Sequence, residues 1–125
     1  MTAGALILIV EDNEKNLKLA RDLLRVKGFQ TLEARTAEEG LELARAHRPK
    51  VVLMDIQLPG QDGFAALRVL RADPATADLI VIAFTASVMT DDVARVQEAG
   101  FDGFIAKPIS VREFPEQVRR LLEQR

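Results

Sequence analysis

Five side chains that could bind a metal ion or a phosphate group each lie where an apolar segment of strand length ends. They are Glu11 and Asp12 after residues 6–10, Asp55 after residues 51–54, Thr85 after residues 79–84, and Lys107 after residues 101–106. In an open parallel α/β sheet all strands deliver their carboxyl ends to one edge, and ligands bind in the crevice there. The pattern therefore predicts that these five residues, far apart in the sequence, meet in one site.

The predicted site combines three carboxylates with one ammonium group. Glu11, Asp12 and Asp55 would lie within a few ångströms of one another, where like charges cannot all stay ionised unless a cation or a proton compensates them. The chain has no cysteine and one histidine, His47, which excludes the usual zinc sites and thiolate chemistry. All-oxygen ligands favour magnesium or manganese, and magnesium keeps positions open for water and a phosphate oxygen. We therefore expect a divalent metal site that also receives a phosphoryl group.

Asp55 is the carboxylate placed to react, because it follows a wholly apolar segment at the expected centre of the sheet. There, magnesium and the Lys107 ammonium group would neutralise the phosphate oxygens, and the Thr85 hydroxyl would donate a hydrogen bond to one of them. Taken singly, the residues have plainer interpretations. Glu11 and Asp12 could cap the following helix, Thr85 could be structural, and Lys107 could be a solvated charge. Their joint placement is what favours a phosphoryl-accepting site.

Apolar segments of strand length recur about every 20 to 25 residues and alternate with segments of helical period, which is typical of repeated βαβ units. Residues 51–54 are almost wholly apolar, as in a central strand, whereas residues 29–34 include Gln30, Thr31 and Glu33, as in an edge strand. We therefore predict a flavodoxin-like (βα)5 fold, a doubly wound parallel α/β sheet with strand order 2-1-3-4-5. The expected strands cover residues 6–10, 29–34, 51–54, 79–84 and 101–106, and the expected helices begin near residues 14, 36, 63, 90 and 110.

Local signals mark several helix ends. Gly28 would supply the left-handed residue that ends the first helix, and Thr36 with Glu39 forms a capping box that opens the second. Ser110 with Glu113 forms a second capping box for the last helix. Pro115 would then lie about five residues into that helix, where its missing N–H should cost one backbone hydrogen bond and tighten or kink the first turn.

Length and charge predict a single small domain. We expect residues 1–125 to form one domain without an effector domain, because 125 residues can bury about two-thirds of the surface of the unfolded chain. The net charge of -2 comes from scattered charges, so we expect no nucleic-acid partner and no membrane partner. Residues 1–5 are too short and uncharged for a signal peptide, which predicts a cytoplasmic protein. The surface charge calls for no assembly beyond a monomer or a weak homodimer.

Four stretches of the chain resemble the receiver domains of two-component response regulators. They are Val10-Glu11-Asp12-Asn13, residues 54–63 (MDIQLPGQDG), Thr85-Ala86 and Lys107-Pro108. Through residues 11–14 and 107–111 the chain is most similar to stand-alone regulators of the DivK type. The resemblance implies magnesium-dependent transfer of a phosphoryl group to Asp55 from a phosphohistidine, on a sensor histidine kinase or a histidine phosphotransfer protein. It also implies slow self-catalysed loss of that group, so we do not expect a conventional enzyme.

The resemblance assigns roles to further residues. Asp12 would be a direct metal ligand, Glu11 would act mainly through water, and the backbone carbonyl of Gln57 would be the third protein ligand. The backbone N–H of Ala86 would bind a phosphate oxygen. The Lys107-Pro108 peptide bond would be cis, which only X-Pro bonds tolerate at low cost, and would aim the lysine at the phosphate.

The same resemblance implies a switch driven by charge. Phosphorylation adds nearly two negative charges, which would pull Thr85 and Lys107 inward and open a space for the ring of Phe104. The face formed by the fourth helix, the last strand and the last helix would change shape, and a downstream protein would read the change. Candidate readout residues are Val88, Met89, Phe104, Ile109 and Val111, and Gln57 and Ser87 match positions that tune the access of water.

Other classes of protein share part of this pattern. A haloacid-dehalogenase-like phosphatase needs a second carboxylate two residues after its nucleophile, and Gln57 occupies that position. A flavin-binding protein needs a phosphate-binding loop after the first strand, where Glu11 and Asp12 would repel phosphate. A receiver-like module that binds its partner without phosphorylation stays open as the alternative function, although all five site residues are present.

Overall fold

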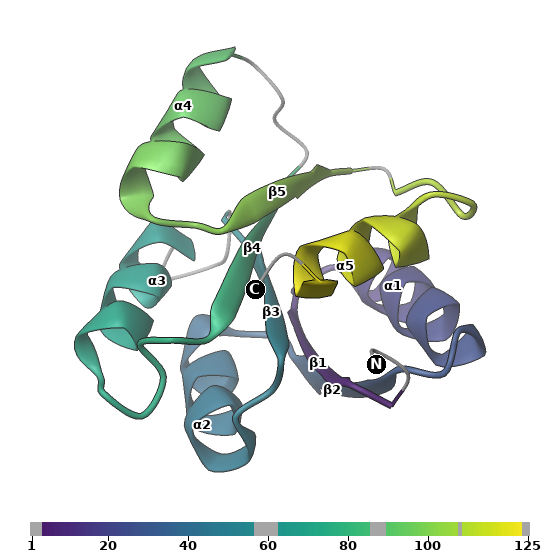
Figure 1. Cartoon of the computed structure of the whole chain (residues 1–125), viewed down its shortest axis with the longest axis horizontal. Coiled ribbons are helices and arrows are strands. Elements are labelled where there is room, and N and C mark those ends of the chain that lie inside the picture. Colours follow the sequence, from purple (N-terminus) through teal and green to yellow (C-terminus); the bar gives the residue numbers. More distant parts are fainter. Residues whose placement is uncertain (1–3, 57–62, 86–89, 108, 124–125) are drawn as a thin grey trace.

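A five-stranded parallel sheet with the predicted order β2-β1-β3-β4-β5 forms the centre of the molecule, and helices cover both of its faces (Figure 1). The computed structural model describes residues 4–56, 63–85, 90–107 and 109–123. None of the helices in these ranges is long and apolar enough to cross a membrane. The elements are β1 (Leu6–Val10), α1 (Glu14–Val26), β2 (Gln30–Ala34), α2 (Ala37–His47), β3 (Val51–Asp55), α3 (Gly63–Ala72), β4 (Ile80–Thr85), α4 (Thr90–Ala99), β5 (Gly103–Ala106) and α5 (Phe114–Glu123).

The ends of α1 and α2 follow the predicted signals. Gly28, just after α1, has a φ of 92°, the left-handed conformation that a glycine adopts without strain. At the start of α2, the Thr36 hydroxyl accepts a hydrogen bond from the Glu39 N–H (3.1 Å), and the Glu39 carboxylate accepts one from the N–H of Arg35 (3.1 Å). The predicted cap at Thr36 is therefore confirmed, with the Glu39 carboxylate accepting from the N–H of Arg35 rather than from that of Thr36.

Several strands differ from the prediction by one or two residues. β3 includes Asp55, and β4 runs to Thr85, so both residues end their strands rather than follow them. β5 begins only at Gly103, because the N–H of Phe101 still donates to the carbonyl of Val96 in α4 (3.3 Å). The sheet itself therefore fixes the backbones of Asp55 and Thr85.

The last helix begins at Phe114, later than the predicted start near Ser110. Pro115 therefore lies in the first turn of α5, where a backbone N–H needs no partner within the helix. The Ser110 hydroxyl accepts from the N–H of Glu113 (3.2 Å), and the Ser110 carbonyl accepts from the N–H of Phe114 (2.9 Å). The predicted capping box therefore stabilises a turn before the helix. Pro115 has no N–H, so it cannot continue the i to i−4 hydrogen bonds from this turn into α5.

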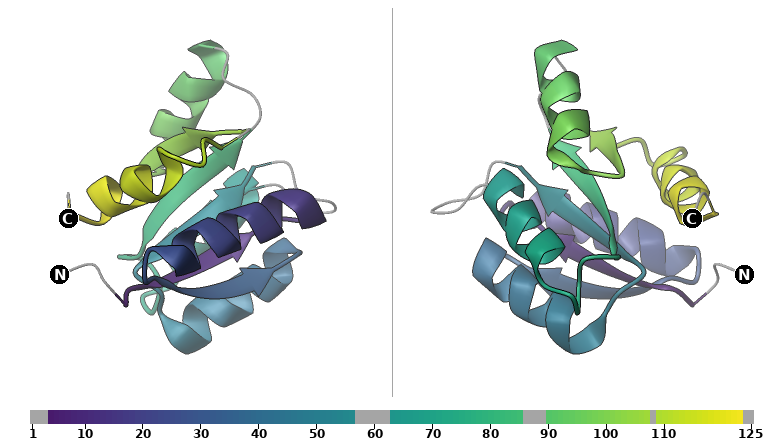
Figure 2. Two further views of the ribbon diagram at one scale, coloured as in Figure 1. Left: turned by 90° about the vertical axis from the view of Figure 1, so that its right-hand side faces the viewer. Right: turned by 60° about the vertical axis from the view of Figure 1, so that its left-hand side comes forward.

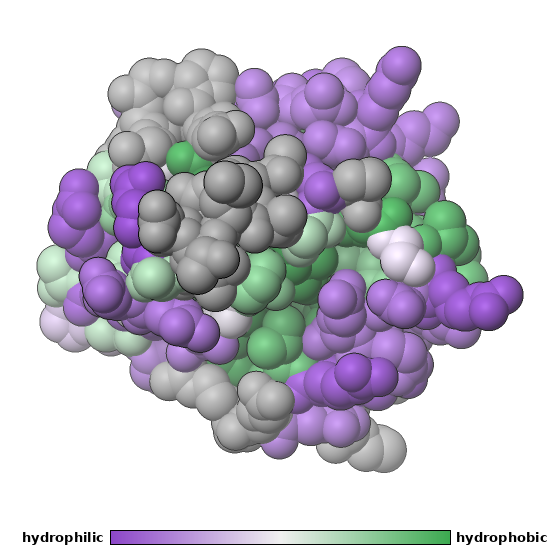
Figure 3. Space-filling model, turned by 90° about the horizontal axis from the view of Figure 1, so that it is seen from above, coloured by the Kyte–Doolittle hydropathy of each residue, from purple (hydrophilic) through white to green (hydrophobic). Residues whose placement is uncertain are grey.

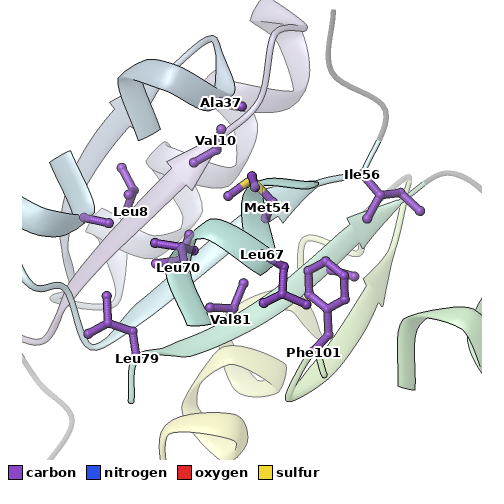
Figure 4. Packing of buried hydrophobic residues seen from close by; sticks show 14 of the residues in the cluster. Leu8, Val10, Ala37, Met54, Ile56, Leu67, Leu70, Leu79, Val81 and Phe101 are labelled. Carbon is purple, nitrogen blue, oxygen red and sulfur yellow. The ribbon is translucent and has the colours of Figure 1, made fainter. Parts of the chain in front are cut away.

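Two hydrophobic clusters, one on each face of the sheet, form the core. Figure 2 shows α1 and α5 on one face and α2 and α3 on the other. On the second face, apolar side chains from β1, β3 and β4 pack against α2 and α3 (Figure 4). Val96 of α4 belongs to the same cluster. β3 and β4 are buried along their whole length, whereas β2 is largely half-buried, as predicted for central and edge strands. The predicted site residues also lie on both faces of the sheet, some on each.

Candidate functional site

Glu11, Asp55 and Lys107 lie on the face of the sheet that α1 and α5 cover. Successive side chains alternate between the faces of a strand, and each of these residues follows, two positions later, a residue of the α1/α5 cluster. The preceding residues are Ile9, Leu53 and Ile105. The strand pairing continues to the charged residues, because the N–H of Glu11 donates to the carbonyl of Ala34 (2.9 Å) and that of Lys107 to the carbonyl of Thr85 (2.7 Å). The sheet therefore brings two carboxylates and an ammonium group together.

Lys107 joins the two buried carboxylates. Its Nζ atom lies 2.6 Å from Glu11 Oε1 and 3.2 Å from Asp55 Oδ2. The Glu11 residue is 0% exposed and Asp55 is 4% exposed, while the Lys107 side chain is 11% exposed. Little water screens these charges, so the ammonium group attracts both carboxylates strongly.

Burial raises the pKa of the Glu11 carboxyl group above its ordinary value. Hydrogen bonding with Asp55 raises this pKa further, and the hydrogen bond from Lys107 lowers it. Loss of hydration and a neighbouring carboxylate both disfavour the charged form, so one ammonium group does not fully offset them. The site is thus short of positive charge.

A divalent cation would supply the missing positive charge. Glu11, Asp12 and Asp55 each offer one carboxylate oxygen, and these oxygens lie within 4.8 Å of one another. Ligands on opposite sides of Mg2+ lie about 4.2 Å apart, so a small adjustment would complete such a set. Asp12 is exposed, which leaves a side of the cluster open to water. The donor chemistry and spacing suit magnesium.

Glu11 and Asp12 do not cap α1, so the alternative structural role considered for them was wrong. Asn13 is the N-cap, and its side chain accepts a hydrogen bond from the N–H of Asn16 (3.1 Å). Glu11 Oε2 accepts one from the N–H of Asn13 (3.3 Å). Glu11 is therefore held on both oxygens, one toward the start of α1 and the other toward Lys107.

Thr85 and Phe104 belong to the opposite face of the sheet. Thr85 follows Ala83 by two positions, and Phe104 is paired with Ala83 in the adjacent strand. Thr85 is 2% exposed, whereas Phe104 is 37% exposed. Both residues thus lie on the side where α4 packs. The predicted roles of Gln57, Ala86, Ser87, Val88, Met89 and Pro108 fall outside the described residues.

Sequence reasoning missed the part that Gly63 plays at the start of α3. A Cβ atom on Gly63 would lie 2.7 Å from the carbonyl oxygen of Asp55 and 2.7 Å from the Cα atom of Ile56. The N–H of Gly63 donates to the carbonyl of Ile56 (3.2 Å). Because these neighbours are backbone atoms, they cannot rotate away from a side chain. Gly63 therefore lets α3 approach the end of β3 closely.

We expect Gly63→Ala to lower the free energy of unfolding by about 2 kcal/mol, because the added methyl group must push α3 or β3 aside. Urea denaturation measures this loss. Gly103→Ala is the matched control, since its Cβ would meet the rotatable tip of the Leu121 side chain at 3.0 Å. Equal losses in the two variants would contradict the importance of the backbone contact.

Comparisons with known proteins agree with the site. The model of the response regulator receiver domain matches residues 7–119. The polar-differentiation response regulators DivK of Brucella anthropi and Brucella ovis are 44% and 43% identical over 116 residues, which cover 93% of this chain and 94% of each relative. A putative response regulator from Chloroflexus aurantiacus is 28% identical with a TM-score of 0.90, covering 96% of this chain and 98% of that one.

A second solved structure, a CheY-like receiver domain protein from Methanospirillum hungatei, is 26% identical with a TM-score of 0.87, covering 98% of this chain and 96% of that one. The family match spans residues 7–119, from β1 into α5. It includes the carboxyl ends of the strands where Glu11, Asp55 and Lys107 meet. The chain therefore belongs to the response regulator receiver domain family.

Proposed function

We propose that the chain works as a single-domain response regulator in a phosphorelay, with Asp55 as the phosphoryl acceptor. The observation that carries the proposal is the buried Asp55 carboxylate, 3.2 Å from Lys107 Nζ and in one oxygen cluster with Glu11 and Asp12. The donor would be a phosphohistidine on a sensor histidine kinase or a histidine phosphotransfer protein. No substrate is turned over, so the reaction is a modification of the chain itself.

In the transfer, a carboxylate oxygen of Asp55 attacks the phosphorus atom and the phosphorus–nitrogen bond of the donor breaks. The donor imidazole leaves with the electron pair and keeps a proton. Magnesium bound by Asp12, Asp55 and, through water, Glu11 would supply positive charge to the phosphoryl oxygens. Lys107 would turn from the carboxylates to a phosphoryl oxygen, and the Thr85 hydroxyl would donate to another. Slow hydrolysis of the acyl phosphate would return the chain to its first state.

The proposed output is a change on the face formed by α4, β5 and α5. Phosphorylation adds nearly two negative charges at Asp55. Thr85 and Phe104 share the α4 side of the sheet, so movement of Thr85 toward the phosphate would free space toward which the Phe104 ring could turn. Phe104 is 37% exposed and Val111 is 66% exposed, which makes both available to a downstream protein. Figure 3 shows a group of hydrophobic residues, in green, bordered by hydrophilic residues on one side of the molecule.

The test is uptake of a phosphoryl group from a small-molecule phosphodonor, measured as intact mass with and without Mg2+. We expect one magnesium-dependent phosphoryl group, and borohydride trapping followed by peptide mass analysis should place it on Asp55. Trapping also detects an adduct that hydrolyses quickly. Absence of any trapped adduct would overturn the proposal and favour a receiver-like module that binds its partner without phosphorylation.

A further inference from the structure

An aromatic pair lies against the ammonium group of Lys107. Lys107 Nζ is 5.0 Å from the centroid of the Phe84 ring, on its face. The Phe84 ring in turn stacks on Phe114, with centroids 6.1 Å apart and an interplanar angle of 27°. Both phenylalanine residues are 0% exposed. Phe114 is the first residue of α5, so the pair runs from the site to the beginning of that helix.

The strand register places Phe84 where it can act on the site. Phe84 is paired with Asp55 in β3 and with Ile105 in β5, so its ring shares a face with the carboxylate and with the segment that leads to Lys107. The two carboxylates hold the ammonium group from one side, through Glu11 Oε1 and Asp55 Oδ2. The Phe84 ring lies over the same ammonium group. Its face is electron-rich, so it attracts a cation in a way that an aliphatic side chain of similar size cannot.

We propose that Phe84 is a positioning residue that holds the Lys107 ammonium group by a cation–π contact, and that its stack with Phe114 ties this contact to the first turn of α5. The functional part rests on the proposed role of Lys107 in phosphoryl transfer. The contact restrains Nζ within reach of Asp55, so that the ammonium group has less conformational freedom to lose when it turns to an arriving phosphoryl group. Cation–π attraction is stronger when water is excluded, as it largely is here.

The first experiment observes the Lys107 ammonium group directly, in the unphosphorylated protein. The other four lysines of the chain, Lys15, Lys18, Lys27 and Lys50, are exposed, so their ammonium protons exchange quickly with water. A slowly exchanging lysine ammonium signal in proton–nitrogen NMR spectra should therefore belong to Lys107 and disappear in Lys107→Met. We expect Phe84→Leu to speed its hydrogen exchange by about tenfold.

Two further variants separate the cation–π contact from packing. Phe84 replaced by 3,4,5-trifluorophenylalanine keeps the ring but withdraws its electron density, and it should also speed the exchange of the Lys107 signal. Phe29→Leu is the matched control, because Phe29 is buried in the same hydrophobic cluster at the opposite end of the sheet, and it should leave the signal unchanged. If the fluorinated ring preserves slow exchange while Phe84→Leu does not, the ring acts by packing alone and the proposal is overturned. Unchanged exchange in both Phe84 variants would overturn it as well.

Phe114→Leu tests the link to α5. We expect its exchange rate to lie between those of the wild-type chain and Phe84→Leu, because the Phe84 ring then keeps its contact with Lys107 but loses its support. An exchange rate equal to that of the wild type would remove Phe114 from the proposal. A second readout is phosphorylation at saturating phosphodonor, which should slow in the Phe84 variants with little change in the apparent affinity for the donor. If the wild-type chain takes up no phosphoryl group while the exchange rates behave as described, the proposed function fails and the contact between Phe84 and Lys107 stands.

Discussion

Asp55→Asn is expected to take up no phosphoryl group, with a rate at least about a thousandfold below that of the wild-type chain. The amide keeps the size of the carboxylate but is a poor nucleophile, and no bond to phosphorus can form at that position. Intact mass after incubation with phosphodonor and Mg2+ measures the loss. Asp22→Asn is the matched control, because the Asp22 carboxylate is exposed on α1. Within the described residues its ion pair is with the neighbouring Arg21, at 3.1 Å.

The same variant should be at least as stable as the wild-type chain in metal-free buffer. It removes one of three carboxylates that crowd a single ammonium group, and Lys107 keeps its shorter contact with Glu11. Thermal unfolding in the presence of a chelator checks this point. A stable variant that still accepts a phosphoryl group would show that another residue is the acceptor. An unfolded variant would contradict the statement that repulsion among the three carboxylates destabilises the metal-free site.

Lys107→Met is expected to lower the free energy of unfolding by about 3 kcal/mol in metal-free buffer, or the unfolding midpoint by about 10 °C. Methionine preserves much of the apolar length of the side chain but leaves Glu11, which is 0% exposed, and Asp55 without their ammonium partner. Removing one member of a buried ion pair is costly because the remaining charge has lost its hydration and gains nothing in return.

Magnesium should restore part of this stability. A divalent cation in the oxygen cluster neutralises the same carboxylates, so the gain in unfolding midpoint on adding Mg2+ should be larger for Lys107→Met than for the wild-type chain. Lys18→Met, at an exposed position of α1, serves as the control and should shift the midpoint little. If both lysine variants unfold at the wild-type midpoint, the buried ion pair contributes little to stability.

The topology was predictable because burial and strand position leave a clear mark on composition. β3 and β4 are buried throughout and contain apolar residues almost without interruption, while β2 at the edge contains Gln30, Thr31 and Glu33. The last helix was harder, because the spacing of Ser110 and Glu113 suits a helix cap and also a single turn. Pro115 favours the single turn followed by a later helix start, because a proline is well accepted in the first turn of a helix.

The site was predictable as a set of residues but not as a set of contacts. The rule that parallel strands end at one edge places Glu11, Asp55 and Lys107 together without any knowledge of packing. It does not say that Lys107 lies closer to Glu11 than to Asp55, since side-chain direction depends on burial and on neighbours from other elements. Phe84 reads as an ordinary strand residue in the sequence, and only its register with Asp55 reveals its place beside the ammonium group.

The contact between Glu11 and Lys107 joins residues that are 96 positions apart. A ribosome releases the chain amino end first, so Glu11, Asp12 and Asp55 emerge well before β5 and Lys107 do. Until then Lys107 is not available to Glu11 and Asp55. A nascent or truncated chain therefore carries the acceptor but not the finished site. Translation must therefore pass Lys107 before the complete cluster of charges can form.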